Sequence, residues 1–235
     1  MRDRHVTRAC VASPAWLVDL LLPPRCVSCG GPSHTLCSGC RDLLRHVRPP
    51  LCARCGAPTA WPVERCRECA GRRLAFASAR SAVEYTGPAR ALVLAWKERG
   101  LRHLAACAAE LVVTHVERPA ADVITYIPPD PIRQLGRGRH PAELLARDLA
   151  RRWELDFVSL LERRRSAERQ ATLPFAQRGA NVRRVFTSQR SPAARVLLVD
   201  DVYTTGSTVN AAASALRGEG ARTVDVVTLA RAIRR

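Results

Sequence analysis

From residue 76 onward, the chain alternates between two hydrophobic patterns. Four apolar runs, at residues 77–85, 121–127, 195–199 and 223–229, are typical of buried strands. The segments between them repeat apolar residues every three or four positions, which predicts helices. These helices are expected at residues 87–100, 101–115, 141–153 and 208–216. Strands that alternate with helices predict crossover connections and a mainly parallel sheet.

The first 75 residues lack this alternation and contain two short helix signals. Residues 14–22 predict an amphipathic helix that ends at Pro23-Pro24, and residues 41–47 predict a second helix before Pro49-Pro50. The first stretch is too short to span a bilayer, and Asp19 interrupts it. The dense arginine and cysteine that follow also argue against an export signal. We therefore expect a small domain at residues 1–75, a second domain at residues 76–235, and a cytoplasmic protein without a membrane span.

The composition is that of a folded chain with a strong basic bias. Of 235 residues, 47% are hydrophobic and 25% charged, which excludes disorder as the main state. The formal net charge is +17, and Lys97 is the only lysine among 38 basic residues. Arginine suits phosphate groups, which favours an anionic partner. A purely compositional preference for arginine explains the same charge equally well.

Eight of the ten cysteines form four Cys-x-x-Cys pairs. They are Cys26/Cys29, Cys37/Cys40, Cys52/Cys55 and Cys66/Cys69. Two such pairs supply four thiolates to one tetrahedral zinc with no open position, so we expect about two structural zinc ions. Sequential pairing, with the first two pairs on one zinc and the last two on another, is favoured over a cross-braced arrangement, which stays open. A disulfide framework is the alternative, but a reducing compartment favours metal.

Single residues near these pairs give further expectations. Gly30 and Gly56 directly follow two of the pairs, where the chain must turn tightly. Cys10 and Cys107 lie outside the pairs and receive no role. Cys107 lies on an apolar helical face and is expected to be buried as a small hydrophobe. His115, at the edge of that face, is not expected to bind metal.

The strongest chemical signal lies at residues 196–208. Four apolar residues form a strand, Asp200 and Asp201 follow, and a turn rich in threonine, glycine and serine leads into a helix. Amides at a helix start bind anions, and Gly206 lets the backbone approach closely. Because carboxylates accept hydrogen bonds from hydroxyls, a ribose 5-phosphate fits both halves. The alternative is a solvated acid pair beside an ordinary helix cap, although a cap needs only one polar residue. The segment lacks the Gly-Lys-Ser/Thr of a Walker A loop.

This segment resembles the phosphoribosyl diphosphate (PRPP) motif of type I phosphoribosyltransferases. Together with the cysteine pairs, the chain from about Leu20 to Ala230 resembles the ComF family. The other residues that carry this resemblance are Leu21-Leu22-Pro23-Pro24-Arg25-Cys26, Arg137-Gly138, Ala142-Glu143-Leu144-Leu145, Gln170, Leu173, Arg178 and Asn181-Val182. The resemblance implies an α/β fold of the type I phosphoribosyltransferase kind, a mainly parallel sheet flanked by helices, preceded by a cysteine-rich double zinc ribbon.

The resemblance also implies roles for individual residues. Asp200 and Asp201 would accept the ribose 2- and 3-hydroxyls of PRPP. Pro128 and Pro129, in the turn at residues 127–131, would lie along the pyrophosphate, and magnesium would enter with PRPP. A nitrogen nucleophile would displace pyrophosphate from the anomeric carbon, helped by positioning and electrostatics. The turn after the two acids would hold the 5-phosphate; its residues are Tyr203, Thr204, Thr205, Gly206, Ser207 and Thr208.

Three departures from the family pattern affect the acceptor side. Thr204 stands where purine-type members carry an acid that handles the base proton, so general-base chemistry at this position is not expected. Gly138-Arg139-His140-Pro141 replaces the usual Gly-Phe-Asn-Gln, and Lys97-Glu98 replaces Lys-Tyr. His140 is expected in a surface loop, with contact to an acceptor as the alternative.

The arginine-rich segment at residues 131–195 leaves the partner open. Its clusters are Arg163-Arg164-Arg165 and Arg183-Arg184. Three interpretations stand: a solvated surface, a hood that supplies arginines to pyrophosphate, and a track for single-stranded DNA, for which aromatic residues are sparse. Three functional classes follow: a phosphoribosyl-transferring enzyme, a PRPP- or nucleotide-sensing module, and an accessory of DNA uptake and competence that binds single-stranded DNA or a DNA helicase. The sequence leaves the acceptor and the oligomeric state open.

Overall fold

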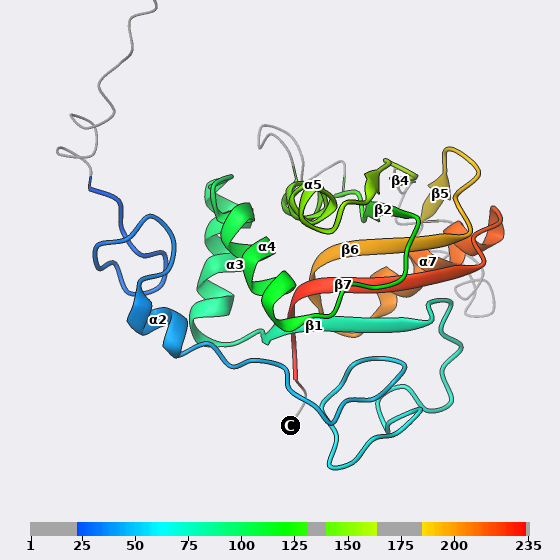
Figure 1. Cartoon of the computed structure of the whole chain (residues 1–235), viewed down its shortest axis with the longest axis horizontal. Coiled ribbons are helices and arrows are strands. Elements are labelled where there is room, and N and C mark those ends of the chain that lie inside the picture. The colour runs from blue at the N-terminus through cyan, green and yellow to red at the C-terminus, as the bar shows by residue number, and fades with distance from the viewer. Residues whose placement is uncertain (1–22, 131–139, 164–184, 234–235) are drawn as a thin grey trace, which may run out of the picture.

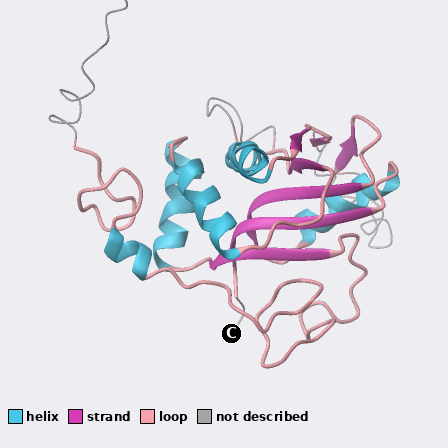
Figure 2. Ribbon diagram, viewed as in Figure 1, coloured by secondary structure: helices cyan, strands magenta, loops and turns pink. Residues whose placement is uncertain are grey.

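A parallel sheet forms the centre of the protein. The computed structural model describes residues 23–130, 140–163 and 185–233. Five strands lie in the order β1-β7-β6-β2-β3 (Figures 1 and 2), and each pairs in parallel with its neighbours. They are β1 (Ser78–Glu84), β2 (Val123–Tyr126), β3 (Asp156–Phe157), β6 (Arg195–Tyr203) and β7 (Thr223–Arg231). The parallel α/β architecture predicted from the sequence is confirmed.

Helices cover both faces of this sheet. On one face, α3 (Gly87–Arg99), α4 (Leu104–His115) and α5 (Pro141–Trp153) share an apolar core with Leu197 and Val199 of β6. On the other, α7 (Ser207–Gly218) shares a second core with Val196 and Leu198. Consecutive residues of β6 therefore enter different cores, as expected for a strand that is buried on both faces. Cys107 is buried in the first of these cores, as expected.

The limits of two helices follow the residues that mark them in the sequence. Pro88 lies in the first turn of α3, where its missing N–H leaves no hydrogen bond unmade. Gly100 ends that helix with a left-handed φ of 63°. At the start of α5, the His140 side chain accepts a hydrogen bond from the Ala142 amide. The helices predicted at residues 87–100 and 141–153 are confirmed.

A short antiparallel hairpin was not apparent from the sequence pattern. Its strands are β4 (Leu161–Arg163) and β5 (Phe186–Ser188). Three residues are too few to show a hydrophobic period, and the same holds for the two residues of β3. The buried ring of Phe186 joins this hairpin to the core that contains α7.

The helix predicted at residues 41–47 is wrong. The helix in this region is α2 (Ser38–Asp42), which begins after Cys37. Residues 45–47 run antiparallel beside β1 instead: Val47 N donates to the Ala82 carbonyl (3.0 Å), and Glu84 N donates to the Arg45 carbonyl (2.7 Å). Because β1 is an edge strand of the sheet, its free backbone groups capture this segment before it completes a helix.

Two cysteine loops precede the sheet and lie well apart in Figure 1. The first cysteine loop spans residues 26–40, and the second cysteine loop spans residues 52–69. Cys26 and Cys40 of the first pack into the core of α3, α4 and α5, whereas Cys52 and Cys69 of the second pack into the core of α7. Each loop therefore contributes to a core of the sheet, and the domain boundary after residue 75 stays a prediction.

Gly56 permits the close approach of the second cysteine loop to β1. Its φ of 70° lies in the left-handed region, and a Cβ at this position would lie 2.1 Å from the carbonyl oxygen of Ala79. Only glycine satisfies both conditions. Gly30 has a φ of 76°, so both glycines form the tight turns that their positions predict.

Some predictions concern residues outside the described part of the chain. They are the helix at residues 14–22, Cys10, Gly138-Arg139, and most of the arginine-rich segment, including Arg164, Arg165, Arg183 and Arg184. Among the residues that are described, no helix combines the length and the hydropathy that a bilayer crossing requires.

Candidate functional site

The sheet opens at the carboxyl ends of β2 and β6. The last residue pair between them joins Tyr126 to Val199, after which β2 ends and β6 continues to Tyr203. The chain then leaves β2 toward α5 and β3, and leaves β6 toward α7 and β7, so the two connections run in opposite directions. Such a divergence creates a crevice outside the strand ends, the usual ligand position in parallel sheets. A cavity of about 670 Å³ lies here.

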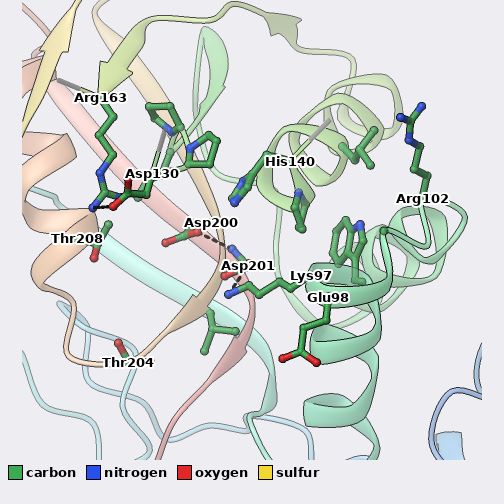
Figure 3. A pocket seen from close by; sticks show the side chains of 18 residues that line it. Lys97, Glu98, Arg102, Asp130, His140, Arg163, Asp200, Asp201, Thr204 and Thr208 are labelled. Atoms are coloured by element: carbon green, nitrogen blue, oxygen red, sulfur yellow. Dashed lines mark hydrogen bonds and ion pairs between the residues drawn. The ribbon is translucent and has the colours of Figure 1, made fainter. Parts of the chain in front are cut away.

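The two predicted acids lie together in this cavity. Asp201 is 3% exposed, and its Oδ2 lies 2.8 Å from Lys97 Nζ of α3 (Figure 3). Asp200 is half-buried, and its Oδ1 accepts a hydrogen bond from the Asp201 amide (2.9 Å). Burial raises the pKa of Asp200 to about 8, and the neighbouring Asp201 charge adds to this effect. Burial alone would lower the pKa of Lys97, but attraction to Asp201 outweighs it and raises that pKa.

A turn rich in hydroxyl groups follows the acids; we refer to residues 203–208 as the hydroxyl turn. Gly206 has a φ of 74° and precedes the first residue of α7. Thr205 Oγ1 accepts a hydrogen bond from the Ser207 amide (3.3 Å) and donates one to Ser207 Oγ (3.0 Å). Thr204 and Thr208 are exposed and line the cavity. The turn therefore offers hydroxyl groups beside the helix start.

The Tyr203 side chain points from the hydroxyl turn into the protein interior. It is 3% exposed, and its ring packs edge-on against Phe76. The residues that line the cavity include Pro128, Pro129, Asp200, Asp201, Thr204 and Thr208. They do not include Tyr203, Thr205, Gly206 or Ser207. Of the residues predicted to hold a phosphate, the structure thus brings two threonines into the cavity, while the others shape the turn.

Further charged residues line the cavity beyond the predicted site residues. Arg163 of β4 approaches Asp130 at 3.7 Å (Figure 3), and its guanidinium also lies over the Phe186 ring. Glu98 and Arg102 also line the cavity. The arginine cluster at residues 163–165 was a visible signal for Arg163, but only the fold shows that Arg163 lines the same cavity as the two acids.

His140 lies at this cavity rather than in an exposed surface loop. It lines the cavity beside α5, and its Nδ1 accepts a hydrogen bond from Ala142 N at 3.4 Å. Burial lowers the pKa of His140, although the Asp201 charge partly offsets the effect. An Nδ1 that accepts from the backbone leaves the ring proton on Nε2, so the neutral imidazole is a hydrogen-bond donor at its other nitrogen.

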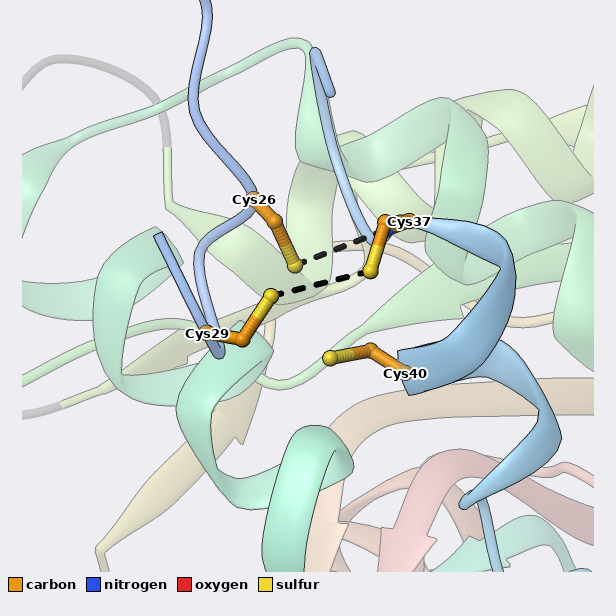
Figure 4. A group of neighbouring side chains, drawn as sticks. All are labelled: Cys26, Cys29, Cys37 and Cys40. Carbon is orange, nitrogen blue, oxygen red and sulfur yellow. Dashed lines mark hydrogen bonds between the residues drawn. The ribbon is translucent and has the colours of Figure 1, made fainter. Parts of the chain in front are cut away.

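Both cysteine loops gather their four sulfur atoms. Cys26, Cys29, Cys37 and Cys40 form one cluster (Figure 4), and Cys52, Cys55, Cys66 and Cys69 form the other; within each, all sulfurs lie within 4.8 Å of one another. This is the sequential grouping rather than the cross-braced one. The eight thiols are free, so they do not form a disulfide framework.

The sulfur geometry fits zinc. Three sulfur pairs lie 3.5–3.6 Å apart, close to the edge of about 3.8 Å of a tetrahedron with Zn–S bonds of about 2.3 Å. Burial raises the pKa of Cys52, but backbone N–H groups, including that of Cys66 at 3.3 Å from its sulfur, outweigh it and lower the pKa to about 7. At this one sulfur the backbone favours the thiolate form that zinc requires, whereas burial raises the pKa of Cys55 and Cys69 in the same loop.

Two protein families match separate parts of the chain. Residues 17–70 match the double zinc ribbon domain, and residues 136–235 match the phosphoribosyl transferase domain. Competence protein F from Haemophilus influenzae is 29% identical over 224 residues, which cover 88% of this chain and 97% of that protein.

Solved structures overlap with smaller parts of the chain. The allosteric regulatory enzyme of purine biosynthesis is 22% identical over 54% of this chain, with a TM-score of 0.40. Glutamine PRPP amidotransferase from B. subtilis, complexed with ADP and GMP, is 25% identical over 54% of this chain, with a TM-score of 0.37. Orotate phosphoribosyltransferase from Aeropyrum pernix is 20% identical over 63% of this chain and 67% of its own, with a TM-score of 0.32.

The chain spans about a quarter of the length of the first two of these enzymes, 26% and 25%. Overlaps of this extent bear on neither substrate nor mechanism. The order of the two matched domains and the nearly full-length similarity to one bacterial protein agree with the resemblance seen in the sequence. The chain is therefore a homologue of competence protein F, and within this chain the match to the double zinc ribbon domain precedes the match to the phosphoribosyl transferase domain.

Proposed function

We propose that the cavity binds PRPP and that the protein transfers its phosphoribosyl group to a nitrogen nucleophile. One observation carries this proposal: Asp200, Asp201, Thr204 and Thr208 line the same cavity. Two carboxylates next to hydroxyls at a helix start suit a ligand with a diol at one end and a phosphate at the other. The match of residues 136–235 to the phosphoribosyl transferase domain supports this assignment.

The lining residues suggest how the ligand lies. The ribose hydroxyls would donate to Asp200 and Asp201, and the 5-phosphate would accept from Thr204, Thr208 and the amides of the turn. The pyrophosphate would extend along Pro128 and Pro129 toward Arg163, which also lines the cavity. The carboxylates beside this path offer oxygen donors, which suit a magnesium ion that enters with PRPP and is held chiefly by ligand oxygens and water.

The chain's own residues supply positioning and electrostatics. In the transfer step, nitrogen forms a bond to the anomeric carbon, the bond from that carbon to pyrophosphate breaks, and pyrophosphate leaves with the electron pair. The proton that nitrogen loses has no acceptor at Thr204, because a hydroxyl is a weak base, so it would pass to solvent water or to an oxygen of the departing pyrophosphate. Arg163 and the amides of the hydroxyl turn would stabilise the departing and retained phosphates, while the two carboxylates face the positive charge that develops on the sugar.

Calorimetric titration with PRPP and magnesium tests the binding half of the proposal. The double variant Asp200→Asn with Asp201→Asn is expected to lose at least tenfold in affinity, since a charge-assisted hydrogen bond lost at Asp201 is worth about 1.5–3 kcal/mol. The control is Asp122→Asn, which removes a carboxylate that binds Arg195 at the opposite end of β6. Equal affinity of the double variant and the control would refute the site.

Pyrophosphate release distinguishes an enzyme from a sensor. With wild-type protein, PRPP and a panel of nitrogen bases, turnover by at least one base supports the transferase, and saturable binding without release supports the sensing module. A track for single-stranded DNA predicts an affinity that falls steeply with salt. No contact among the described residues favours DNA or a helicase over PRPP, so these partners stay predictions from the family resemblance.

A further inference from the structure

The second cysteine loop contacts the hydroxyl turn directly. Arg72, three residues beyond its last cysteine, donates from Nη1 to the carbonyl oxygen of Thr205 at 2.8 Å. Asn210 in the first turns of α7 binds the same stretch twice: its Oδ1 accepts from the Ala75 amide (2.7 Å), and its Nδ2 donates to the Arg73 carbonyl (3.4 Å). The chain that leaves the second cysteine loop is therefore bound to both sides of Gly206.

Arg231 provides a second connection from the interior. It is 1% exposed, and it ends β7 opposite Tyr203. Its Nη1 donates to the carbonyl oxygen of Cys55 (2.6 Å), and its Nη2 pairs with Glu68 Oε2 (2.6 Å). Its guanidinium also lies 4.5 Å above the centre of the Tyr203 ring. One buried cation thus joins a zinc-binding cysteine, an acid of the same loop and the first residue of the hydroxyl turn.

The Tyr203 ring transmits this contact to Gly206. A Cβ at Gly206 would lie 2.2 Å from the Tyr203 hydroxyl oxygen, so ring and backbone are in direct contact. The Tyr203 ring also packs edge-on against the Phe76 ring, with 6.4 Å between the two ring centroids. Because protein interiors are close-packed, a shift of Arg231 or Tyr203 forces a shift of the turn.

The first cysteine loop has a different attachment. Arg41, which follows its last cysteine, pairs with Glu110 of α4 at 3.2 Å and approaches the Cys107 sulfur at 3.6 Å. These contacts lie on the face of the sheet that α3 and α4 cover. In Figure 1 the first cysteine loop is remote from the hydroxyl turn. The chain therefore contains two zinc-binding loops of the same chemistry, each held by an arginine, and one of them contacts the turn.

We propose that the second zinc site positions the hydroxyl turn, with Arg72 and Arg231 as positioning residues. Metal at Cys52, Cys55, Cys66 and Cys69 then favours the turn conformation that receives a phosphate, and a bound phosphate in turn favours retention of that metal. The two effects are equal by linkage. The identity of the ligand rests on the proposed function, whereas the coupling between loop and turn rests on the contacts alone.

Substitution of Arg72 tests the positioning role without disturbing the core. Arg72→Ala is expected to weaken binding of ribose 5-phosphate, which needs no magnesium, by about tenfold. Both zinc ions and the melting temperature should be retained, because the side chain is partly exposed. Arg72→Lys keeps a cationic donor and should recover part of the affinity. Arg41→Ala, the matched control on the first loop, should bind as the wild type does.

If zinc favours phosphate binding, bound phosphate must equally favour zinc retention. Zinc retention is therefore a measurement that an arginine with a merely structural role would not affect. Saturating ribose 5-phosphate is expected to protect one of the two zinc ions against removal by a competing chelator at equilibrium, and to leave the affinity for the other unchanged. This protection should disappear in Arg72→Ala and persist in Arg41→Ala. Protection of both ions, or of neither, in a protein that binds the ligand would overturn the proposal.

Hydrogen exchange without any ligand separates this proposal from the proposed function. Cys66→Ser should speed exchange at the amides of Thr204, Thr205 and Ser207, whereas Cys29→Ser should not. If the wild type fails to bind ribose 5-phosphate while this contrast appears, the coupling stands and the proposed function fails. If the ligand binds but the two cysteine variants exchange alike, the proposed function stands and the coupling is wrong.

Discussion

Lys97 is the one lysine in a chain with 38 basic residues, and it lies in the candidate site. Its Nζ is 2.8 Å from Asp201, a carboxylate whose side chain is 5% exposed. An ammonium concentrates its charge on one atom, whereas a guanidinium spreads it over a planar fork. All the remaining basic residues are arginine. The one lysine therefore stands where a single ammonium pairs with one oxygen of an almost buried carboxylate.

Replacement of Lys97 is expected to destabilise the protein through Asp201. Lys97→Met leaves a buried carboxylate without its cation, which costs about 1–3 kcal/mol in the free energy of unfolding, measured by urea titration at pH 7. The double variant Lys97→Met with Asp201→Asn removes both charges and should recover most of this loss. A single variant as stable as the wild type would show that the ion pair contributes nothing.

Asp200 gives the stability of the protein a pH dependence. Its pKa is raised to about 8 by burial and by Asp201, whereas an unfolded aspartate has a pKa of about 3.9. Between these values the folded protein keeps a proton that the unfolded chain releases, so this group's contribution to stability falls as pH rises from about 4 to about 8.

Asp200→Asn should remove that decline. At pH 4 the variant and the wild type should unfold alike, and at pH 8 the variant should be clearly more stable than the wild type, although its ligand affinity is lower. Thermal unfolding at several pH values between 4 and 8 measures the difference. Parallel pH profiles of the two proteins would contradict the raised pKa.

At the scale of elements, the hydroxyl turn depends on Gly206. Two properties exclude other residues: its φ of 74° and the Tyr203 hydroxyl, which would lie 2.2 Å from a Cβ. Gly100 at the end of α3 has a similar φ of 63° but nothing within 4 Å of a Cβ. The two glycines thus separate the cost of the backbone conformation from the cost of the contact.

Gly206→Ala is therefore expected to be the more damaging of two alanine variants. Gly100→Ala only places an alanine in the left-handed region, which should lower the free energy of unfolding by about 1 kcal/mol. Gly206→Ala also displaces the Tyr203 ring, so it should lower the free energy of unfolding by about 3 kcal/mol. It should also weaken ribose 5-phosphate binding. Urea unfolding and calorimetry measure both effects; equal losses would show that the ring yields freely.

The elements that the sequence predicts well are those whose signals are local. Proline and glycine mark the limits of α3, and an amphipathic period marks α5. The strand predicted at residues 195–199 extends to Tyr203 because β7 pairs with it as far as Arg231, a contact that the local pattern does not contain. Residues 45–47 are not helical as predicted, because they pair with β1, which is distant in the sequence and therefore absent from the local pattern.

The candidate site divides along the same line. Asp200, Asp201 and the threonines follow one another in the chain, so the motif reveals them. Lys97, His140 and Arg163 approach them from three other elements, and only the fold shows that they share a cavity. His140 illustrates the limit best: in the sequence it precedes a proline in a polar stretch, whereas in the structure it caps α5 and faces the two acids.

At the scale of the whole molecule, the two cysteine loops and the sheet are built into one another. Leu36 and Leu44 lie beside Cys26 in the core of α3 and α4, and Phe76 lies beside Cys52 in the core of α7. Zinc loops of this size have too little apolar surface to fold alone and depend on their metal. Metal removal should therefore expose parts of both cores of the sheet.

Unfolding experiments with and without metal test this integration. Elemental analysis is expected to find about two zinc ions per chain, and a strong chelator should lower the melting temperature of the whole protein by about 10 °C or more, in a single transition by far-ultraviolet circular dichroism. Lowering the pH should act in the same direction, because protons compete with zinc for the thiolates. If the loops were an independent domain, the sheet would instead melt at an unchanged temperature after chelation, and the ribbon would unfold separately.

Cys29→Ser and Cys66→Ser extend the comparison: each should lose one zinc, and both should melt earlier, because each loop is packed into a different face of the same sheet.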